Sequence, residues 1–450
     1  MMRRFIGISI LFLTLVLTSC SNSDYLNAIP KNSTAIVKVD MGEVSGVKNK
    51  ALLQALLRVS NLSKSGIDLS SDVYLFETVD GNLGLCARVN DAGDLEKTFN
   101  EMVKKGVCTD VKERRGFHFT MMNNSWVVGF SDDALLVVGP VTMAARTEME
   151  GKLTSFLGQD EEHGIKSSPM FDKLDSISAP TAMVAQAQAL PEKFIAPFTL
   201  GAPKDADPSQ VLIAAEMKVK DGCLDILGTT FSFNRRVNES LRQSSEVFRP
   251  IKGRYANCLS SDAMMAMFMN VDGNKYIDLL RRNSGFQALL AGINTAIDMD
   301  NIIKSVDGDL AIMVPVMSED HLRLSMAAEL AHSKWLSDVG YWKQSCPEGG
   351  RITDWGTNAY SYINGTTSFY FGVTPDGQFY SGSNAEEAKN SIVPSTNSIS
   401  ESLQSKIKGG KMVMVVNMKA FSGEEGILPT LQGLLRPVFG DVNSIVYSMK

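Results

Sequence analysis

Four short apolar runs, each rich in β-branched residues or methionine, follow polar turns along the chain, at 34–41, 181–187, 263–271 and 411–418. Their length and composition predict strands. Helix-like stretches over 47–62 and 276–297 follow the first and third runs, with apolar residues at helical spacing. The runs start 147, 82 and 148 residues apart (34 to 181, 181 to 263, 263 to 411). This long, short, long spacing indicates two tandem copies of one two-part unit.

The expected fold is therefore α+β, with two tandem units of antiparallel sheet and covering helices. The first unit would occupy 34–250, with a long part over 34–180 and a short part over 181–250. After a connector at 247–257, the second unit would occupy 258–450, with a long part over 263–410 and a short part over 411–450. That last part lacks a returning strand and a closing helix, so we expect a truncated copy whose strand at 444–449 has an open edge.

Turn residues support hairpins inside each long and short part. Asn123-Asn124, Asp221-Gly222 and Asn364-Gly365 each stand between two strand-like segments. Asn, Asp and Gly tolerate the positive φ angles that tight hairpin turns require. These three positions are therefore predicted to be hairpin turns.

The N-terminus has the pattern of an export signal. A basic pair at Arg3 and Arg4 precedes an apolar run over 5–17, which is shorter than the roughly 20 residues that span a bilayer. Residues 17–20, Leu-Thr-Ser-Cys, resemble a bacterial lipobox, in which the cysteine thiol receives the lipid before cleavage. We expect a signal peptide over 1–19, lipid attachment with palmitate at Cys20, and a tether over 20–33.

A family resemblance follows from this lipobox together with Ile29-Pro30-Lys31-Asn32-Ser33 and the strand-like residues 35–40. The chain resembles a family of uncharacterised Bacteroidetes lipoproteins with a domain of unknown function. The resemblance implies a cell-envelope location and an α+β fold, and it implies no activity. Only Asp24 is acidic just after Cys20, which favours an outer-membrane lipoprotein facing the periplasm over one on the cell surface.

Composition narrows the classes of partner. The 450 residues are 44% hydrophobic and 21% charged, with 44 Lys and Arg against 50 Asp and Glu, a net charge of -6. No general basic surface is expected, so nucleic acid is not an expected partner. The expected partners are the membrane, through the lipid anchor, and another envelope protein or a glycan; the oligomeric state stays open. Of six cysteines, five remain beside Cys20, in no C-x-x-C pairing and with their disulfide pairing undetermined.

Catalytic and metal-binding motifs are not found in the sequence. The chain holds no G-x-S-x-G, Walker A, G-x-G-x-x-G or H-E-x-x-H pattern. The four histidines are far apart, the acidic loop at 159–164 is read as a solvated connector, and the methionines at 264–269 as packing on both faces of a strand. No catalytic, cofactor-binding or metal-binding residue is therefore assigned, and no cofactor is expected.

Two weaker candidates remain. Aromatic residues crowd into 335–380, and exposed rings there would bind a sugar or peptide by stacking, whereas buried rings would serve packing. The candidate ligand-binding residues are Trp335, Trp342, Trp355, Tyr360 and Tyr362. Ser176, in Asp175-Ser176-Ile177, matches a short O-glycosylation pattern.

Function is left open between classes. The leading hypothesis is a non-catalytic binding or scaffold protein, because an anchor and a repeat occur without a catalytic motif. The alternative is a hydrolase of envelope glycan or peptide, with a site assembled from distant carboxylates. A third hypothesis is a purely structural spacer. Whether the chain is an enzyme is not decided by its sequence.

Overall fold

The computed structural model describes residues 23–44, 62–190, 192–317, 322–365, 367–421, 436 and 439–450. The predicted signal peptide, Cys20 and the expected helix at 47–62, apart from its last residue, lie outside these ranges and stay predictions. The described residues form two compact units, one ending at Asp172 and one that begins at Lys173. Each unit is described by itself.

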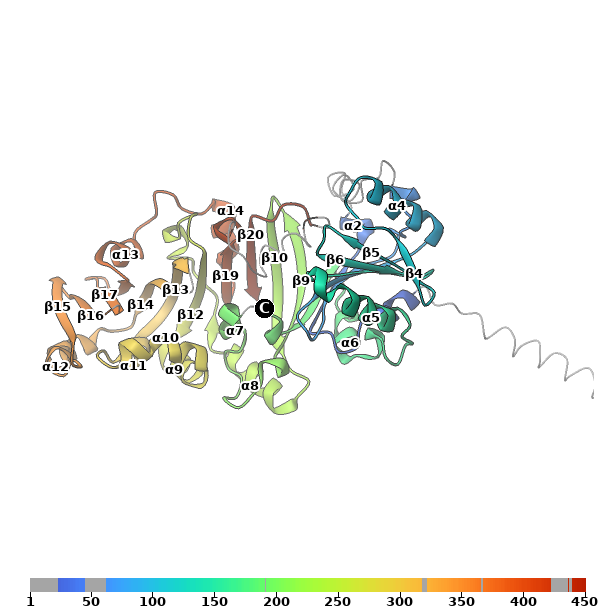
Figure 1. The fold of residues 1–450 in the computed structure, drawn as a ribbon. Helices are drawn as coiled ribbons and strands as arrows, with labels where there is room; N and C mark the ends of the chain where they lie inside the picture. The colour runs from blue at the N-terminus through green and yellow to red at the C-terminus, as the bar shows by residue number, and fades with distance from the viewer. Residues whose placement is uncertain are drawn as a thin grey trace, which may run out of the picture. The chain divides into compact units, whose positions relative to one another are not determined.

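A seven-stranded antiparallel sheet forms the first unit (Figure 1). Its neighbouring strands are, in order, β1 (Ala35–Val39), β2 (Val73–Glu77), β3 (Leu83–Arg88), β7 (Ala134–Gly139), β6 (Trp126–Phe130), β5 (Phe117–Met122) and β4 (Lys112–Arg114). Asn123 and Asn124, between β5 and β6, have φ angles of 49° and 57°, so the predicted hairpin turn is confirmed.

Helices pack on the sheet of the first unit through apolar side chains. The amphipathic helix α4 (Ala92–Lys104) begins at Asp91, whose side chain accepts a hydrogen bond from the backbone N–H of Asp94. Its buried Leu95, Phe99 and Met102 form a core with residues of β6 and β7. The other helices are α2 (Met41–Val44), η2 (Leu62–Lys64), η3 (Met143–Ala145), α5 (Arg146–Leu157), η4 (Ile165–Ser167) and, at the unit boundary, α6 (Pro169–Asp175).

The segment expected as a tether over 20–33 is largely folded. Residues Asp24–Ala28 form the 3-10 helix η1, and Tyr25, Leu26 and Ile29 are buried. The Tyr25 hydroxyl donates a 2.8 Å hydrogen bond to the carbonyl of Asp72. Apolar residues at this point in the sequence therefore enter the core, and the described chain is part of the folded unit from its first residues.

The second unit contains a twelve-stranded run of paired strands. Its order is β8 (Thr181–Gln186), β9 (Leu212–Lys220), β10 (Cys223–Phe231), β20 (Ser444–Met449), β19 (Met412–Asn417), β12 (Met265–Asp272), β13 (Val306–Met317), β14 (Leu322–Leu330), β18 (Gln378–Gly382), β17 (Thr367–Val373), β16 (Ala359–Asn364) and β15 (Gly350–Gly356). The short β11 (Phe248–Arg249) also pairs with β12. All pairings are antiparallel except that of β10 with β20.

The helices of the second unit lie between these strands in the sequence. Three of them, α9 (Gly273–Arg282), α10 (Ser284–Asn294) and α11 (Met299–Lys304), lie together beside strands β12, β13 and β14 (Figure 1). The others are η5 (Ala187–Ala189), α7 (Glu192–Phe198), η6 (Pro208–Gln210), α8 (Arg235–Ser245), η7 (Ala256–Cys258), η8 (Lys334–Asp338), α12 (Val339–Gln344), α13 (Ala385–Asn390), α14 (Glu401–Ile407) and η9 (Met418–Phe421).

These helices and paired strands confirm the α+β class and the four recurring strands, which are β1, β8, β12 and β19. The run β12-β13-β14-β18-β17-β16-β15 has the same order of strands along the chain as the sheet of the first unit. The expected copy boundary at 250–258 falls inside the second compact unit, between β11 and η7. A repeat boundary marks where one copy of a pattern ends and need not coincide with the boundary of a compact unit. The division into tandem copies therefore stays a prediction.

The last strand is not an open edge. β20 pairs with β19 on one side and, in parallel, with β10 on the other, where Cys223 faces Ser444 and Gly228 faces Met449. Asp221 and Gly222, with φ angles of 53° and 73°, make the predicted turn before β10. The expectation of an exposed edge at 444–449 was wrong, because a strand more than 200 residues earlier in the sequence covers it.

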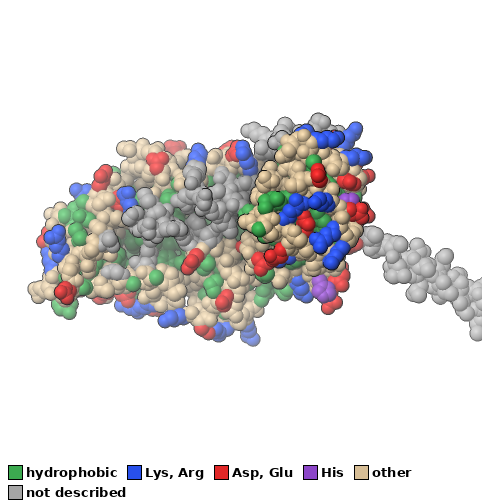
Figure 2. Space-filling view, in the orientation of Figure 1, with side chains coloured by type: hydrophobic (Ala, Val, Ile, Leu, Met, Phe, Trp, Pro, Cys, Tyr) green, Lys and Arg blue, Asp and Glu red, His purple; other side chains and the backbone are tan. Residues whose placement is uncertain are grey.

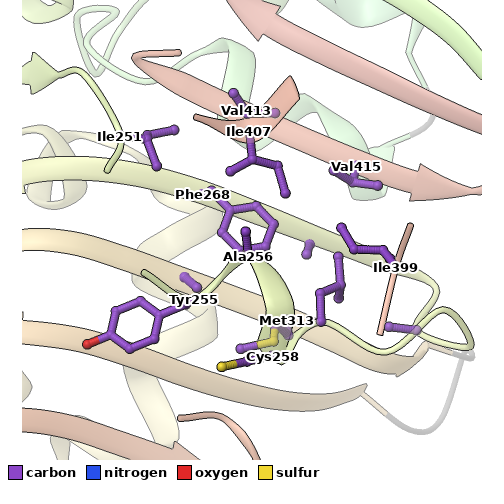
Figure 3. Packing of buried hydrophobic residues seen from close by; sticks show 14 of the residues in the cluster. Ile251, Tyr255, Ala256, Cys258, Phe268, Met313, Ile399, Ile407, Val413 and Val415 are labelled. Carbon is purple, nitrogen blue, oxygen red and sulfur yellow. The ribbon is translucent and has the colours of Figure 1, made fainter. Parts of the chain in front are cut away.

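One face of the second sheet carries a core of interlocking apolar side chains. Phe268, Met313, Val413 and Val415 come from the strands, and η7, α14 and the neighbouring loops cover them (Figure 3). Alternate residues of β13 point to this face and to the opposite one, as strand geometry requires. The opposite face meets α9, α10 and α11.

Surface charges are mixed. Acidic and basic side chains are interspersed over the face drawn in Figure 2, in keeping with the small net charge. Within the described ranges, no helix has both the length and the apolar character needed to cross a membrane.

Candidate functional site

A cavity of about 540 Å³ lies in the second unit, between helices α9, α10 and α11 and the sheet. Its volume falls within the range of small-ligand pockets, roughly 300–1,000 Å³. Most of its wall is apolar. The apolar and aromatic lining residues are Tyr276, Leu280, Phe286, Leu290, Ile293, Met299, Ile302, Ile303, Val306, Leu310, Ile312, Leu324, Met326, Ala328, Phe369 and Phe379.

Strand alternation builds the floor of this cavity. Leu310 and Ile312 of β13 face it, whereas Ala311 and Met313 between and after them face the core on the other side. Leu324, Met326 and Ala328 on β14 repeat the pattern. Because apolar residues occupy both alternating positions, these strands are covered on both faces, and the helices must cover the second one.

Side-chain caps fix where the three covering helices begin. Asp272 accepts a hydrogen bond from Asn274 N at 3.0 Å at the start of α9, and Asp298 accepts one from Asn301 N at 3.0 Å at the start of α11. Gly273 lies so close to α11 that a Cβ atom there would stand 2.0 Å from the carbonyl oxygen of Ile303. The absence of a side chain at this one position lets α9 and α11 close the cavity.

Polar lining groups gather at the end of the sheet where β14 and β17 begin and β18 ends. They are Arg323, Thr367, Ser368, Ser381 and Ser383. The Ser368 hydroxyl donates to the carbonyl of Ser383 at 2.9 Å, and the Ser383 hydroxyl accepts from Leu324 N at 3.4 Å. The cavity therefore has an apolar body and one polar end.

Ser381 differs from the other serines at this end. Only 1% of the residue is exposed, and it lies on the same side of β18 as Phe379, which also lines the cavity. Among the residues that the structure describes, none forms a hydrogen bond with its hydroxyl. The residue lines the cavity, so its hydroxyl offers an unused donor and acceptor there.

The charge at the polar end is a paired one. The Arg323 guanidinium, whose side chain is 46% exposed, contacts the carboxylate of Glu387 on α13, whose side chain is 13% exposed. The other carboxylate oxygen of Glu387 accepts from Ser383 N at 3.3 Å. A guanidinium carries five N–H donors, so one carboxylate partner does not use all of them.

The chemistry of this lining is that of binding rather than of proton transfer. Its described residues include no Asp, Glu, His, Cys or Lys. Across the ranges with assigned structure, no three His, Cys, Asp or Glu side chains are grouped so that they could hold a metal ion. The arrangement supports enclosure of an apolar molecule with a polar group at one end.

The five aromatic candidates separate into two groups. Trp335, Trp342 and Tyr362 are 3%, 5% and 1% exposed, so their rings serve the core and present no binding face. Trp355 and Tyr360 are half-buried. The Lys389 ammonium lies 5.3 Å from the ring centroid of Trp355, and that of Lys343 lies 5.3 Å from that of Tyr360. A role of these two in ligand binding stays a prediction.

Packing explains where the aromatic region lies. The Trp335 ring is 6.0 Å from Trp342 and 6.3 Å from Phe379, centroid to centroid, and its indole N–H donates to the Ser305 hydroxyl at 3.2 Å. Phe379 is itself part of the cavity wall. Burial of these rings thus supports the wall from behind.

The remaining candidates lie apart from the cavity. Ser176 is exposed just after α6, and its hydroxyl donates to the Lys173 carbonyl at 2.7 Å, so O-glycosylation there stays a prediction. His163 is exposed and hydrogen-bonded to Asp160 at 2.6 Å. His118 is half-buried and stacks on Phe130.

The five described cysteines are free thiols, four of them buried. Burial raises the pKa of the Cys108 thiol and of the Cys258 thiol to about 11 each. Their side chains therefore remain protonated near neutral pH and act as small apolar groups.

Sequence reasoning missed the cavity. Its residues run from 276 to 383 and were read as strand and helix packing. A signal for it exists in the two-sided apolar pattern of β13 and β14 and in Ser381 among the aromatic residues of β17 and β18, but neither shows that space remains between the layers.

Comparisons with known proteins identify a family without an activity. A family model with the description "Domain of unknown function (DUF4836)" matches residues 27–446. No curated protein matches the chain. A solved structure described as "Structure of crystal form IV of TP0453" is similar over 44% of this chain and 76% of that chain, at 12% sequence identity and a TM-score of 0.28. A similarity at that score supports no conclusion on fold or function.

Proposed function

The chain belongs to the DUF4836 family of unknown function, and we propose that it is a non-catalytic, lipid-anchored cell-envelope protein that binds an apolar ligand in the cavity beneath α9, α10 and α11. The single observation that carries the binding role is the cavity itself, about 540 Å³ with walls that are mostly apolar. Burial of apolar ligand surface is favourable at roughly 25 cal/mol per Å².

A neutral fluorescent probe tests the binding role directly. N-phenyl-1-naphthylamine should gain fluorescence on addition of the full chain, because it enters an apolar environment. The variant Ile312→Trp places a large ring from β13 into the cavity and should abolish that gain. The matched control Leu227→Trp adds the same ring on the exposed side of β10, where Leu227 is 41% exposed, and should bind the probe as the wild type does. Equal binding by both variants would contradict the cavity as the site.

The envelope location rests on the sequence of residues 1–20. An apolar run, small residues and Cys20 together support lipid attachment, and the single acidic residue Asp24 supports an orientation towards the periplasm. Incorporation of labelled palmitate into the wild type and its loss in Cys20→Ser test the anchor. Protease treatment of intact cells tests the orientation, since digestion would place the protein on the cell surface.

A duplication of one α+β unit is also part of the proposal. The two matching long spacings, 147 and 148 residues, and the common strand order of the two seven-stranded runs support it. A strand-by-strand superposition tests it: equivalent strands should align with their buried positions in register, and a shift of one residue between strands would argue against a common origin.

The hydrolase alternative has no specific observation in its favour. It requires two carboxylates close together in a pocket, one of them with a raised pKa. Within the described part of the chain, the cavity lining contains no carboxylate. The binding role is therefore the one that we develop.

A further inference from the structure

We infer that the ligand is a single-chain amphiphile with an anionic head group, which lies with its chain between the helices and the sheet and with its head at the Ser381 hydroxyl and the Arg323 guanidinium. This inference rests on the proposed function, since it names the class of ligand for the same cavity. It follows from the uneven distribution of polar groups in the cavity wall.

The first observation is the unpaired hydroxyl of Ser381. The residue is 1% exposed, lines the cavity from β18, and has no hydrogen-bond partner among the described residues. A ligand atom that accepts its proton would form a hydrogen bond inside an otherwise apolar site, and that bond is stronger when the acceptor is charged. The position therefore favours a polar atom of the ligand at this end.

The second observation is that the neighbouring groups are donors. The Thr367 hydroxyl lines the same end and has no partner among the described residues, and the Ser383 hydroxyl, which accepts from Leu324 N, keeps its own proton available. Several donors at one end of the cavity favour a head group with several acceptor oxygens, such as a carboxylate or a phosphate.

The third observation is the sign of the charge. Arg323 is the charged residue among the described lining residues, and it keeps N–H donors beyond the contact with Glu387. Glu387 is paired with that guanidinium, accepts from Ser383 N, and is not among the residues that line the cavity. An anionic head is therefore favoured over a cationic one, and hydrogen bonds to a charged head are stronger than those to a neutral one.

The body of the cavity accounts for the chain. Its wall is apolar on the helix side, at Leu280, Leu290 and Ile303, and on the sheet side, at Leu310 and Met326. Each methylene buried there should tighten binding about fourfold until the chain fills the cavity. A single chain with the head at the rim matches a site that is polar at one end.

Calorimetric titration of the full chain with three twelve-carbon probes, each below its micelle concentration, tests the head group. The probes are dodecanoate, dodecyl phosphate and dodecanol. We expect at least one of the two anionic probes to bind about tenfold or more tightly than dodecanol, and the tighter of the two identifies carboxylate or phosphate as the head. Dodecanol that binds as tightly as both anions would overturn the inference.

Two substitutions distinguish an effect on head-group binding from an effect on the stability of the fold. Ser381→Ala and Arg323→Gln should each weaken the better anionic probe about tenfold and change dodecanol binding less. Ser381→Ala should not lower the melting temperature, because its hydroxyl has no partner to lose. The matched control is Ser361→Ala: Ser361 is 3% exposed, lies outside the cavity, and its hydroxyl is 2.9 Å from that of Thr353. This control should lower the melting temperature and leave binding unchanged.

The outcomes distinguish the two levels of the proposal. If none of the three probes binds the wild type, the binding function itself is refuted. If all three bind equally and Ser381→Ala has no effect on the anions, the cavity binds apolar molecules and the head-group assignment is refuted. A loss of anion binding in Ser361→Ala equal to that in Ser381→Ala would also refute it.

Discussion

A buried carboxylate on β13 should be a main source of stability in the second unit. The Asp309 side chain is 2% exposed and accepts four hydrogen bonds. Its Oδ1 accepts from Lys252 N at 2.9 Å and from Asn270 Nδ2 at 2.8 Å. Its Oδ2 accepts from Gly253 N at 2.7 Å and from Arg254 N at 2.9 Å. The carboxylate thus fixes the connector at 252–254 against the sheet.

The substitution Asp309→Asn keeps the shape and reverses one end of this arrangement. The amide NH₂ of the new Asn side chain must take the place of one carboxylate oxygen. The two N–H groups that donate to that oxygen would then face another donor, and both hydrogen bonds would be lost. Hydrogen bonds to a charged acceptor contribute about 1.5–3 kcal/mol each. Loss of two, partly offset by the lower cost of burying a neutral group, should lower the free energy of unfolding by about 2–4 kcal/mol.

Urea unfolding followed by tryptophan fluorescence measures this effect, because Trp335, Trp342 and Trp355 lie in the second unit and report on it. The control is Asp307→Asn on the same strand. Its carboxylate is 53% exposed and pairs with Arg249 at 2.8 Å, and exposed pairs contribute at most about 1 kcal/mol. An Asp309→Asn midpoint equal to that of the control would refute the reasoning.

Three further predictions follow from buried and paired groups. The Tyr276 hydroxyl is buried without a partner in the described chain, so Tyr276→Phe should leave the free energy of unfolding unchanged or raise it by up to about 1 kcal/mol. Tyr25→Phe loses a 2.8 Å hydrogen bond and should lower the free energy of unfolding by a similar amount. Urea unfolding that shows the reverse order of stability would contradict this. Thiol labelling of the native protein should modify Cys346 alone among the five described cysteines, because the other four are buried. The labelling should be slower than that of a fully exposed cysteine, because desolvation raises the pKa of Cys346. Mass spectrometry that locates label at a buried cysteine would contradict this prediction. Hydrogen bonding to Asp160 raises the pKa of His163, so any stabilisation by this pair is present at low pH and is lost as the pH rises through the raised pKa. An NMR titration should show that Asp160→Asn lowers the pKa of His163. An unchanged pKa in that variant would contradict the pairing.

Most of the predicted strands and turns follow from patterns of apolar and turn residues over a few neighbouring positions. The strands at 181–187 and 411–418 follow from a period that is set within a few positions, and the turn at Asn123-Asn124 follows from backbone preference alone. Such features require no knowledge of distant residues. The structure therefore repeats them with shifts of only a few residues at their ends.

The candidate site could not be predicted in the same way. Ser381 is one residue in an alternating strand, and the sequence does not distinguish a serine paired in the core from one directed into a cavity. The aromatic residues nearby were candidates for a binding face, yet Trp335 and Tyr362 are buried, since alternation along a strand does not reveal which face another layer covers. Whether space remains beneath α10 depends on how three helices pack at once.

The sequence by itself determined the local elements and the recurrence of its strands, because side-chain periodicity and turn preferences act over a few residues. Only the tertiary structure decided which strand completes the sheet beside β20, where β10 replaces the expected open edge, and where an apolar cavity lies with Ser381 and Arg323 at one end. The physical reason is that strand pairing and enclosed volume arise from contacts between segments about one hundred to more than two hundred residues apart. Many distant segments offer equally suitable apolar faces, and the packing of the whole unit selects among them.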